Sequence, residues 1–231
     1  MSKKKLACHF VIKRLFDMLF SGIAIIILIP MWAAIGIAIK LDSKGKIIFV
    51  QDRLTKDGKV FEMYKFRSMV ENAETMGTGL FNYENDPRVT KVGRFLRNTS
   101  LDELPQLWNV LKGDMSIVGP RPAVNYELGD YETLNKRFKK RFSVPGGITG
   151  LAQVKGRNEN SWSEKIKFDN RYIDIFQRYG IWIDIWILME TVKKVFKKEN
   201  IYEARIEGAS SDLESAAMAE CEIIKTAHWP D

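Results

Sequence analysis

The chain has 231 residues, of which 45% are hydrophobic and 28% are charged. This length fits one compact domain, or one domain with a membrane element and a tail, and excludes a large multidomain protein. The hydrophobic content also excludes a chain that is disordered overall. The formal net charge of +7 favours an anionic partner, without choosing among nucleic acid, phospholipid and a phosphorylated metabolite.

The N-terminal region contains a long apolar stretch. No charged residue occurs from Met18 to Ile39, and at about 1.5 Å per helical residue this stretch can cross a hydrocarbon core of about 30 Å. The small-residue cleavage site of a signal peptide is absent, so we expect the segment to be retained. The sequence therefore predicts a membrane-embedded segment over residues 1–40.

A proline interrupts the apolar stretch. Proline inside a helix removes a hydrogen bond and clashes with the preceding turn, so we expect a sharp kink at Ile29 and Pro30. Both flanks are rich in Lys and Arg, whereas a spanning helix usually carries its positive charge on one side. We favour a re-entrant helix-break-helix with both ends on the cytoplasmic side. A spanning helix stays open as an alternative, because such helices tolerate proline.

Residues 41–202 are expected to form a helix-rich α+β domain on the cytoplasmic side. Residues 47–51 and 60–66 are strand-like and flank a turn signal at residues 56–59, so they predict a small β-hairpin. Residues 71–100 combine glycine, proline and polar residues with a basic run, which predicts a long loop that leads into a helix.

The C-terminal part predicts a helix and a tail. The stretch from Tyr172 to Lys198 is rich in Ile, contains Trp182 and Trp186 and ends in paired lysines. This pattern is typical of an amphipathic helix in a membrane interface, and a plain core helix is an equally good interpretation. Residues 203–231 are acidic and are expected to form a solvated tail without a catalytic role.

Cysteine and histidine are too few for several kinds of site. Cys8 and Cys221 lie near opposite ends, without the spacing of a zinc site or a disulfide framework, which fits a reducing compartment. His9 and His228 lie near the termini, which disfavours a histidine metal cluster or a Ser-His-Asp triad. We therefore expect any chemistry to come from carboxylates, Lys, Arg or a bound hard cation.

Asp102 and Glu103 are adjacent carboxylates at a predicted helix start. Ser100 and Glu103 match a capping box, and taken alone this structural interpretation is the commoner one. The surrounding arginines favour a second interpretation. Arg97 lies upstream, and Arg121 lies downstream between two prolines that restrict its backbone, an arrangement suited to binding phosphate.

The carboxylate pair also suggests a metal and a reaction. Neighbouring carboxylates repel each other unless one is protonated, an arginine lies nearby or a divalent cation binds. A magnesium ion would also hold phosphate oxygens, and it needs only one or two protein carboxylates. The set is consistent with phosphoryl transfer, with an Asp as nucleophile or metal ligand and with arginines stabilising the charge at phosphorus.

A glycine-rich motif covers residues 145–150 and is followed by Lys155 and Arg157. Glycines permit close approach of the backbone to a ligand, and the two cations could meet a pyrophosphate. A turn that joins two elements is the commoner meaning of such glycines, and both interpretations stay open.

As an ordered set, these motifs resemble the bacterial sugar transferase family, the monotopic polyprenol-phosphate phosphoglycosyl transferases. The resemblance covers residues 11 to about 200 and rests on Lys13-Arg14-x-x-Asp17, the proline-containing apolar helix, Lys65-Phe-Arg67-Ser-Met69, Asp86-Pro-Arg88, Arg94-Phe-Leu-Arg97, Ser100-Leu-Asp-Glu-Leu-Pro-Gln106, Gly119-Pro-Arg-Pro122 and Gly150-x-x-Gln153-Val-x-Gly-Arg157. It implies a membrane-dipping enzyme that moves a sugar 1-phosphate from a UDP-sugar to polyprenyl (undecaprenyl) phosphate, releases UMP and uses Mg²⁺. It also implies the cytoplasmic face of a bacterial inner membrane and the first membrane step of glycan assembly.

The resemblance further implies roles for particular residues. Asp102 would attack the sugar-linked phosphate, form a covalent phosphosugar intermediate and contact the metal, while Glu103 would support the site. Substrate contacts would fall on Lys65, Arg97, Arg121, Lys155 and Arg157. Asp169 and Tyr172 occupy a further position of the family pattern.

The chain departs from the family pattern at three places. Ile29 precedes Pro30 where members often have Ser, Thr55 stands where Gly is common, and residues 145–147 contain one glycine more than usual. Large members have additional membrane helices before the catalytic region. The ten residues before Val11 are too short for one, so the resemblance is to the small type.

The net positive charge of the chain is also consistent with a function of a different class. A non-catalytic scaffold at the membrane surface would bind anionic lipid through a basic face and use Asp102 and Glu103 as a helix cap. A nucleic-acid binder is disfavoured by the membrane segment and by the lack of a recognised binding motif. We therefore expect a UDP-sugar, polyprenyl phosphate and the phospholipid bilayer as partners, and no nucleic acid.

Overall fold

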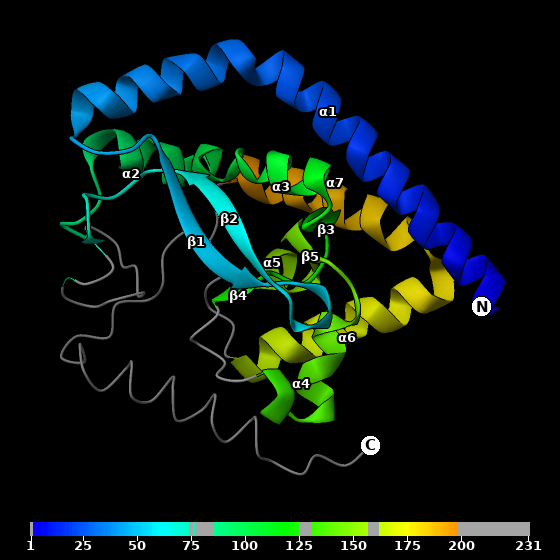
Figure 1. Ribbon diagram of the computed structural model, residues 1–231. Coiled ribbons are helices and arrows are strands. Elements are labelled where there is room, and N and C mark those ends of the chain that lie inside the picture. The colour runs from blue at the N-terminus through cyan, green and yellow to red at the C-terminus, as the bar shows by residue number, and fades with distance from the viewer. Residues whose placement is uncertain (1, 74–75, 77–85, 125–130, 157–161, 198–231) are drawn as a thin grey trace.

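The computed structural model describes residues 2–73, 76, 86–124, 131–156 and 162–197. The helices are α1 (Lys3–Asp42), α2 (Lys91–Asn98), α3 (Gln106–Lys112), α4 (Lys136–Lys140), α5 (Leu151–Lys155), α6 (Trp162–Tyr179) and α7 (Trp182–Lys197), with short 3-10 turns η1 (Lys56–Gly58), η3 (Leu101–Glu103), η4 (Tyr131–Thr133) and η5 (Arg141–Ser143). The strands are β1 (Ile48–Leu54), β2 (Val60–Phe66), β3 (Met115–Val118), β4 (Ala123–Val124) and β5 (Gly146–Thr149). Figure 1 shows the expected helix-rich α+β arrangement; the predicted acidic tail, residues 203–231, lies outside the described residues.

The predicted hairpin is confirmed. Strands β1 and β2 pair antiparallel, with Ile48 opposite Phe66 and Leu54 opposite Val60. In the turn between them Gly58 has a φ of +72°, which glycine adopts without steric cost. Strand β4 pairs with the other edge of β1 and completes a three-stranded sheet in the order β2-β1-β4.

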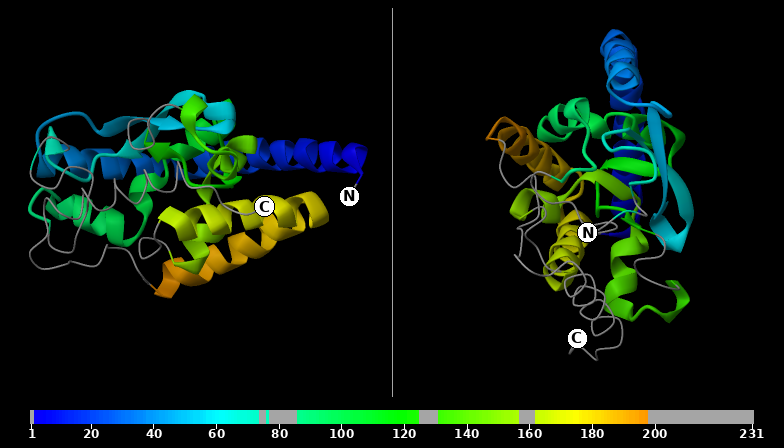
Figure 2. Two further views of the ribbon diagram at one scale, coloured as in Figure 1. Left: turned by 90° about the horizontal axis from the view of Figure 1, so that it is seen from below. Right: turned by 90° about the vertical axis from the view of Figure 1, so that its left-hand side faces the viewer.

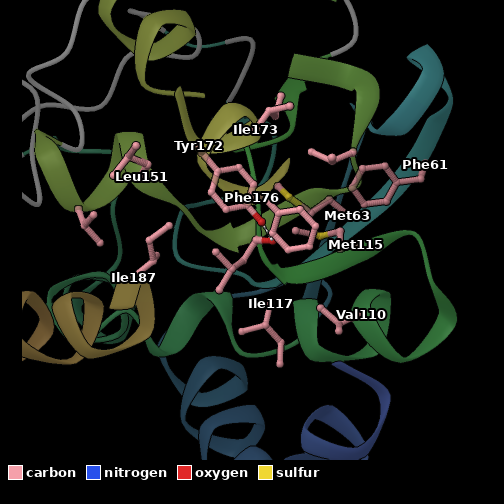
Figure 3. Close-up of a cluster of buried hydrophobic side chains, with 13 residues drawn as sticks. Phe61, Met63, Val110, Met115, Ile117, Leu151, Tyr172, Ile173, Phe176 and Ile187 are labelled. Carbon is pink, nitrogen blue, oxygen red and sulfur yellow. Dashed lines mark hydrogen bonds between the residues drawn. The ribbon is translucent and has the colours of Figure 1, made fainter. Parts of the chain in front are cut away.

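A second, two-stranded parallel sheet of β3 and β5 lies in the main hydrophobic core. Figure 3 shows that α6 contributes Tyr172 and Phe176 to this core, where they meet Met63 of β2 and Met115 of β3. Val110 of α3 is also fully buried. The core therefore joins the hairpin, the parallel sheet and α6 into one body that can hold a site rigidly.

The N-terminal part of α1 is bound to this body by polar contacts. Lys13 Nζ lies 2.6 Å from Asp184 Oδ2 of α7, and both side chains are buried. Arg14 donates hydrogen bonds to two carbonyl groups at the end of α3, at 2.6 and 3.0 Å. Asp17 accepts from the Ile117 N–H at 3.2 Å. The Lys-Arg-x-x-Asp motif thus docks α1 on the domain.

The C-terminal part of α1 contacts the same body. Ile39 is 2% exposed and packs in a cluster with Phe66 and Leu96. Just beyond α1, the Ser43 carbonyl accepts a hydrogen bond from Arg67 Nη2 at 2.7 Å. Figure 1 shows α1 as an arch whose two ends both meet the domain, and Figure 2 gives two further views of its position.

The middle of α1 is apolar and uncovered in the chain itself. Ile26 and Ile27 are 70% and 69% exposed, and α1 is the one described helix that is long and apolar enough to cross a membrane. The helix continues through Ile29 and Pro30 instead of ending there. Figure 1 shows that its axis changes direction between the two halves, so α1 is one bent helix, and the expected re-entrant helix-break-helix stays a prediction.

The single helix expected between residues 172 and 198 is wrong in its bounds. Two helices occur, and Gly180, at a φ of +68°, separates α6 from α7. On α7, Ile187 is fully buried in the core, while Trp182 and Met189 are 69% and 58% exposed. Helix α7 therefore has one face in the core and one exposed apolar face.

Candidate active site

A cleft of about 900 Å³ contains most of the predicted site residues. Residues from β1, β2, η3, α5, α6 and α7 line it, together with the loop between β3 and β4. Five of the predicted site residues line this cleft: Lys65, Arg97, Asp102, Glu103 and Arg121. Five residues that are up to 56 positions apart in the sequence therefore share one cavity.

The two adjacent carboxylates lie in η3, directly after an unusual backbone turn. Ser100 has a φ of +57°, a left-handed conformation that is uncommon for a residue other than glycine and that often occurs at functional sites. Its side chain makes no capping hydrogen bond. The Glu103 side chain binds two cations instead of closing a capping box. The capping interpretation of Ser100 and Glu103 is therefore wrong.

Glu103 is the point on which two cations converge. Arg121 Nη2 donates a 2.5 Å hydrogen bond to Glu103 Oε1, and Lys65 Nζ lies 3.3 Å from the same oxygen. Burial alone would raise the pKa of Glu103, but Arg121 and Lys65 outweigh it and hold the pKa of this carboxyl well below its ordinary value. Burial lowers the pKa of Lys65 to about 8, against the attraction of Glu103. Glu103 is thus a fixed negative charge that orients two positive ones.

Asp102 has a different environment. Within the described residues its carboxylate has no hydrogen-bond or ion-pair partner, and it lines the cleft. Burial, followed by the charge of Glu103, raises its pKa to about 6, although Lys65, Arg97 and Arg121 act in the opposite direction. A carboxylate that is ionised at neutral pH, lacks a partner and faces a basic cavity can attack a phosphorus atom or bind a cation.

Two further arginine motifs have separate roles. Arg97 comes from the last turn of α2, lines the cleft and donates from Nε to Ser68 Oγ at 2.8 Å. Arg88 is buried, forms a 2.7 Å ion pair with Asp86 and donates to two carbonyl groups of the preceding segment. Arg97 can therefore meet a ligand in the cleft, whereas Arg88 does not line the cleft and holds the backbone of a segment at its edge, which includes Ala73.

The glycine-rich motif packs against the loop that carries Arg121. A Cβ atom on Gly147 would lie 2.1 Å from the Gly119 nitrogen, and one on Gly150 would lie 2.1 Å from the Gly119 oxygen. Such distances leave no room for a side chain. The glycines therefore permit close packing of two backbone segments, which favours the structural interpretation of this motif.

Two arginines that the sequence reasoning missed hold the same loop. Arg53 Nη1 donates to the Pro122 carbonyl at 3.0 Å, and Arg141 Nη2 donates to the Arg121 carbonyl at 2.8 Å. Arg53 lies near the end of β1, and no pattern in the sequence assigns it a contact with this loop. Arg141 follows a run of Lys and Arg that looks like a solvated face, so the sequence carries no signal for it.

The structure does not bring Lys155 into the cleft. Its side chain is exposed, and Nζ lies 5.7 Å from the centre of the Trp186 ring on α7. Arg157 lies outside the described residues. A role for these two residues in nucleotide binding stays a prediction.

The donor atoms of the cleft fit a magnesium ion that shares its ligands with substrate and water better than they fit a metal ion bound only by protein side chains. Among the described residues, no three His, Cys, Asp or Glu side chains come together as metal ligands. Magnesium usually keeps several waters and binds through one or two carboxylates plus substrate phosphates. The Asp102 carboxylate, which has no partner in the described part of the chain, fits this requirement.

Comparison with known proteins gives the family. The pattern of the family described as bacterial sugar transferase matches residues 8–198. The chain is 43% identical over 201 residues to a UDP-glucose:undecaprenyl-phosphate glucose-1-phosphate transferase of Klebsiella pneumoniae, which covers 84% of this chain and 42% of the relative. It is 42% identical over 205 residues to the galactosyl transferase CpsE of Streptococcus agalactiae, with coverage of 81% and 42%. It is 40% identical over 205 residues to an undecaprenyl-phosphate galactose phosphotransferase of Salmonella typhimurium, with coverage of 83% and 42%.

The chain spans less than half the length of these relatives. Residues 8–198, which the family pattern matches, contain every described residue that lines the cleft. The match therefore includes the site itself, and the chain belongs to the bacterial sugar transferase family.

Proposed function

We propose that the protein is a phosphoglycosyl transferase that moves a sugar 1-phosphate from a UDP-sugar to polyprenyl (undecaprenyl) phosphate and releases UMP. The observation that carries this proposal is the contrast between two adjacent carboxylates. Glu103 is neutralised by Arg121 and Lys65, whereas Asp102 has no partner among the described residues. The names of the relatives, which contain undecaprenyl phosphate together with glucose or galactose, support the substrate class.

The reaction proceeds in two displacements at one phosphorus atom. In the first, a carboxylate oxygen of Asp102 attacks the sugar-linked phosphorus, the bond from this phosphorus to the bridging oxygen breaks, and UMP leaves with the electron pair. The product is an acyl phosphate between Asp102 and the sugar phosphate. In the second, a phosphate oxygen of the polyprenyl phosphate attacks the same phosphorus and releases the Asp102 carboxylate. The lipid then carries a diphosphate-linked sugar.

The surrounding cations stabilise the charge that develops at phosphorus. Arg121 is held by Glu103 and lines the cleft together with Lys65 and Arg97. Positive groups that are fixed before the reaction need no reorganisation in the transition state, and this preorganisation is usually the largest contribution to catalysis. Asp102 would hold Mg²⁺, which when bound supplies further neutralisation of the phosphate oxygens.

We propose a re-entrant position for α1 in the membrane. Lys13 and Ile39, near opposite ends of α1, both pack on the same cytoplasmic body, while the middle of the helix is apolar and exposed. A straight helix of 40 residues would be about 60 Å long and would separate its ends by far more than a bilayer core. The exposed apolar face of α7 would lie in the interface of the same leaflet. This arrangement supports a site at the cytoplasmic face of the inner membrane, within reach of both a soluble nucleotide sugar and a lipid phosphate.

A membrane scaffold that only binds anionic lipid remains the competing function. It requires Asp102 and Glu103 to be a helix cap, and Ser100 makes no capping bond while Glu103 binds cations. The geometry therefore favours the enzyme over the scaffold.

Intact-mass analysis tests the proposal directly. Purified protein with Mg²⁺ is incubated with single UDP-sugars in the absence of lipid acceptor, and a mass increase of one sugar phosphate on Asp102 is the expected result. Asp102→Asn should give no adduct, and Glu103→Gln, which keeps Asp102, should still give one at a lower rate. The absence of any adduct and of UMP release, with polyprenyl phosphate present and across a broad panel of UDP-sugars, would contradict the proposal and favour the scaffold.

A further inference from the structure

Arg141 is a buried cation on the wall of the cleft that the two displacements do not use. It is 3% exposed, although it directly follows the lysine-rich helix α4. Its Nη2 atom donates to the main-chain carbonyl of Arg121 at 2.8 Å and lies 3.0 Å from Asp169 Oδ2 of α6. One guanidinium group therefore joins the loop that carries Arg121 to a helix of the core.

The loop depends on its carbonyl groups for attachment. Pro120 and Pro122 have no N–H group, so they cannot donate. The Gly147 N–H donates to the Pro120 carbonyl at 2.8 Å, and Arg53 donates to the Pro122 carbonyl at 3.0 Å. Three consecutive carbonyl groups are thus held, and the middle one, which belongs to Arg121 itself, is held by Arg141.

The Arg121 side chain needs this support. It is 41% exposed, and in the cleft it donates a hydrogen bond to Glu103. Packing therefore does not fix its position, and the direction of the guanidinium depends on where the backbone of Arg121 lies. A displacement of about 1 Å in such a group can cost about 10²-fold in rate.

Arg141 is itself fixed from several sides. Asp169 is almost fully buried, and the rings of Phe142 and Trp162 lie 5.6 and 5.4 Å from the centre of the guanidinium group. A buried ion pair adds little net stability, because desolvation of both charges offsets their attraction. A gain in folding stability therefore does not account for the ion pair of Arg141 and Asp169. The pair does orient Arg141 toward the Arg121 carbonyl, which it holds in place.

We propose that Arg141, oriented by Asp169, is a positioning residue that fixes the backbone of Arg121 so that the Arg121 guanidinium stays on Glu103 and faces the donor phosphate. This inference rests on the proposed function. It assigns to Arg141 no contact with substrate, so its effect must pass through Arg121.

A double-mutant cycle tests this dependence. Arg141→Met, Arg121→Lys and the double variant are compared with the parent protein by UMP release, and by the affinity for UDP in the presence of Mg²⁺ in case a rate is too low to measure. We expect Arg141→Met to lower kcat about 10- to 100-fold in the parent. In the Arg121→Lys background the same change should alter rate or affinity by less than about threefold, because residues that act as a unit are not additive.

A neighbouring cation provides a matched control. Lys140 Nζ forms a 2.7 Å ion pair with Asp174, which also joins the end of α4 to α6, but both side chains are exposed. Lys140→Met should leave kcat, KM and UDP affinity unchanged. If Arg141→Met does not fold, Arg141→Lys replaces it, since it keeps a positive charge for Asp169 but lacks the planar guanidinium whose Nη2 atom contacts both Asp169 and the Arg121 carbonyl.

The outcomes separate the inference from the proposed function. Full activity of Arg141→Met, or an equal loss in both backgrounds, would overturn the positioning role while the transferase stands. A merely structural role would lower the melting temperature and the folded fraction but leave the effects additive. Parent protein that neither binds UDP nor releases UMP would overturn the proposed function, and the inference with it.

Discussion

Arg121 donates a 2.5 Å hydrogen bond to Glu103, and the same carboxylate oxygen lies 3.3 Å from Lys65. One acid thus gathers two cations from different parts of the chain beside Asp102. Glu103 therefore orients the charge of the site, and the neighbouring acid is left available for chemistry.

Replacement of Glu103 by Gln should slow the reaction without abolishing it. The amide keeps the shape of the side chain but loses the charge that holds Arg121 and Lys65, so both cations lose their fixed direction. We expect kcat for UMP release to fall on the order of 10²-fold, the loss seen when a positioned charge-stabilising group is removed. An unchanged kcat, or a complete loss of the covalent adduct, would contradict this separation of roles.

Lys65 should produce an alkaline limb in the pH dependence of activity. Burial lowers the pKa of Lys65 to about 8, so the ammonium is charged below that pH and becomes neutral above it. Because only the charged form attracts phosphate, kcat/KM for the UDP-sugar should decline as the pH rises through about 8. In the Lys65→Arg variant the guanidinium stays charged throughout this pH range, so the alkaline limb should be absent. The overall rate of this variant should be lower than that of the parent protein. The same limb in both proteins would assign it to another group.

Gly93 should tolerate no side chain. A Cβ atom there would lie 1.9 Å from the carbonyl oxygen of Ser68, which is backbone and cannot move aside cheaply. Gly93→Ala should therefore destabilise the fold by about 1–3 kcal/mol. It should also lower activity, because Arg97 on the same helix binds the Ser68 hydroxyl. Gly22→Ala is the control, since its nearest neighbour would lie at an ordinary 3.9 Å. Thermal unfolding and UMP release measure both effects, and equal stability of the two variants would contradict the prediction.

Local pattern was enough to predict some parts of this molecule. The hairpin was predicted from strand-like residues around a turn signal, because neighbouring segments and a left-handed glycine determine it. The apolar segment and the carboxylate pair were also predicted. The sequence pattern predicts one helix where α6 and α7 occur, because hydrophobic periodicity does not reveal the positive φ of Gly180 that separates them.

Contacts between distant segments account for what the sequence did not predict. Arg141 is 20 positions from the carbonyl that it binds, and 28 from its ion-pair partner Asp169. In the sequence it is one cation in a basic run, and only the packing of η5 against α6 buries it. Likewise the Ser100 and Glu103 spacing indicates a cap, and only the approach of Arg121 and Lys65 redirects the glutamate.

The buried pair of Lys13 and Asp184 should be important for the docking of α1. Both side chains are less than 10% exposed at a separation of 2.6 Å. Lys13→Met leaves a buried carboxylate without its cation, and breaking such a pair typically costs about 3–5 kcal/mol. The exposed pair of Lys193 and Glu190 is the control, and Lys193→Met should cost less than about 1 kcal/mol. Thermal unfolding in detergent compares the two variants, and equal small losses would mean that this contact does not hold α1.

The two ends of α1 should be accessible from the same side of the membrane. Cys8 is an exposed natural thiol near the start of the helix, and Lys44→Cys would place a second one just beyond its end. Cys8 is tested in a Cys221→Ser background, and Lys44→Cys in a background that also carries Cys8→Ser, so that each protein presents one thiol to a membrane-impermeant maleimide. Because both ends of the helix pack on one domain, we expect both thiols to react in inside-out vesicles and neither to react in intact spheroplasts.

A cysteine in the middle of α1 controls for burial in lipid. Ile27 is 69% exposed in the chain itself, so Ile27→Cys should react only after the membrane is dissolved in detergent. This result would separate a site covered by lipid from one covered by protein. Reaction of Cys8 and Lys44→Cys from opposite sides would make α1 a spanning helix, and its two ends could not then contact one domain on a single side of the membrane.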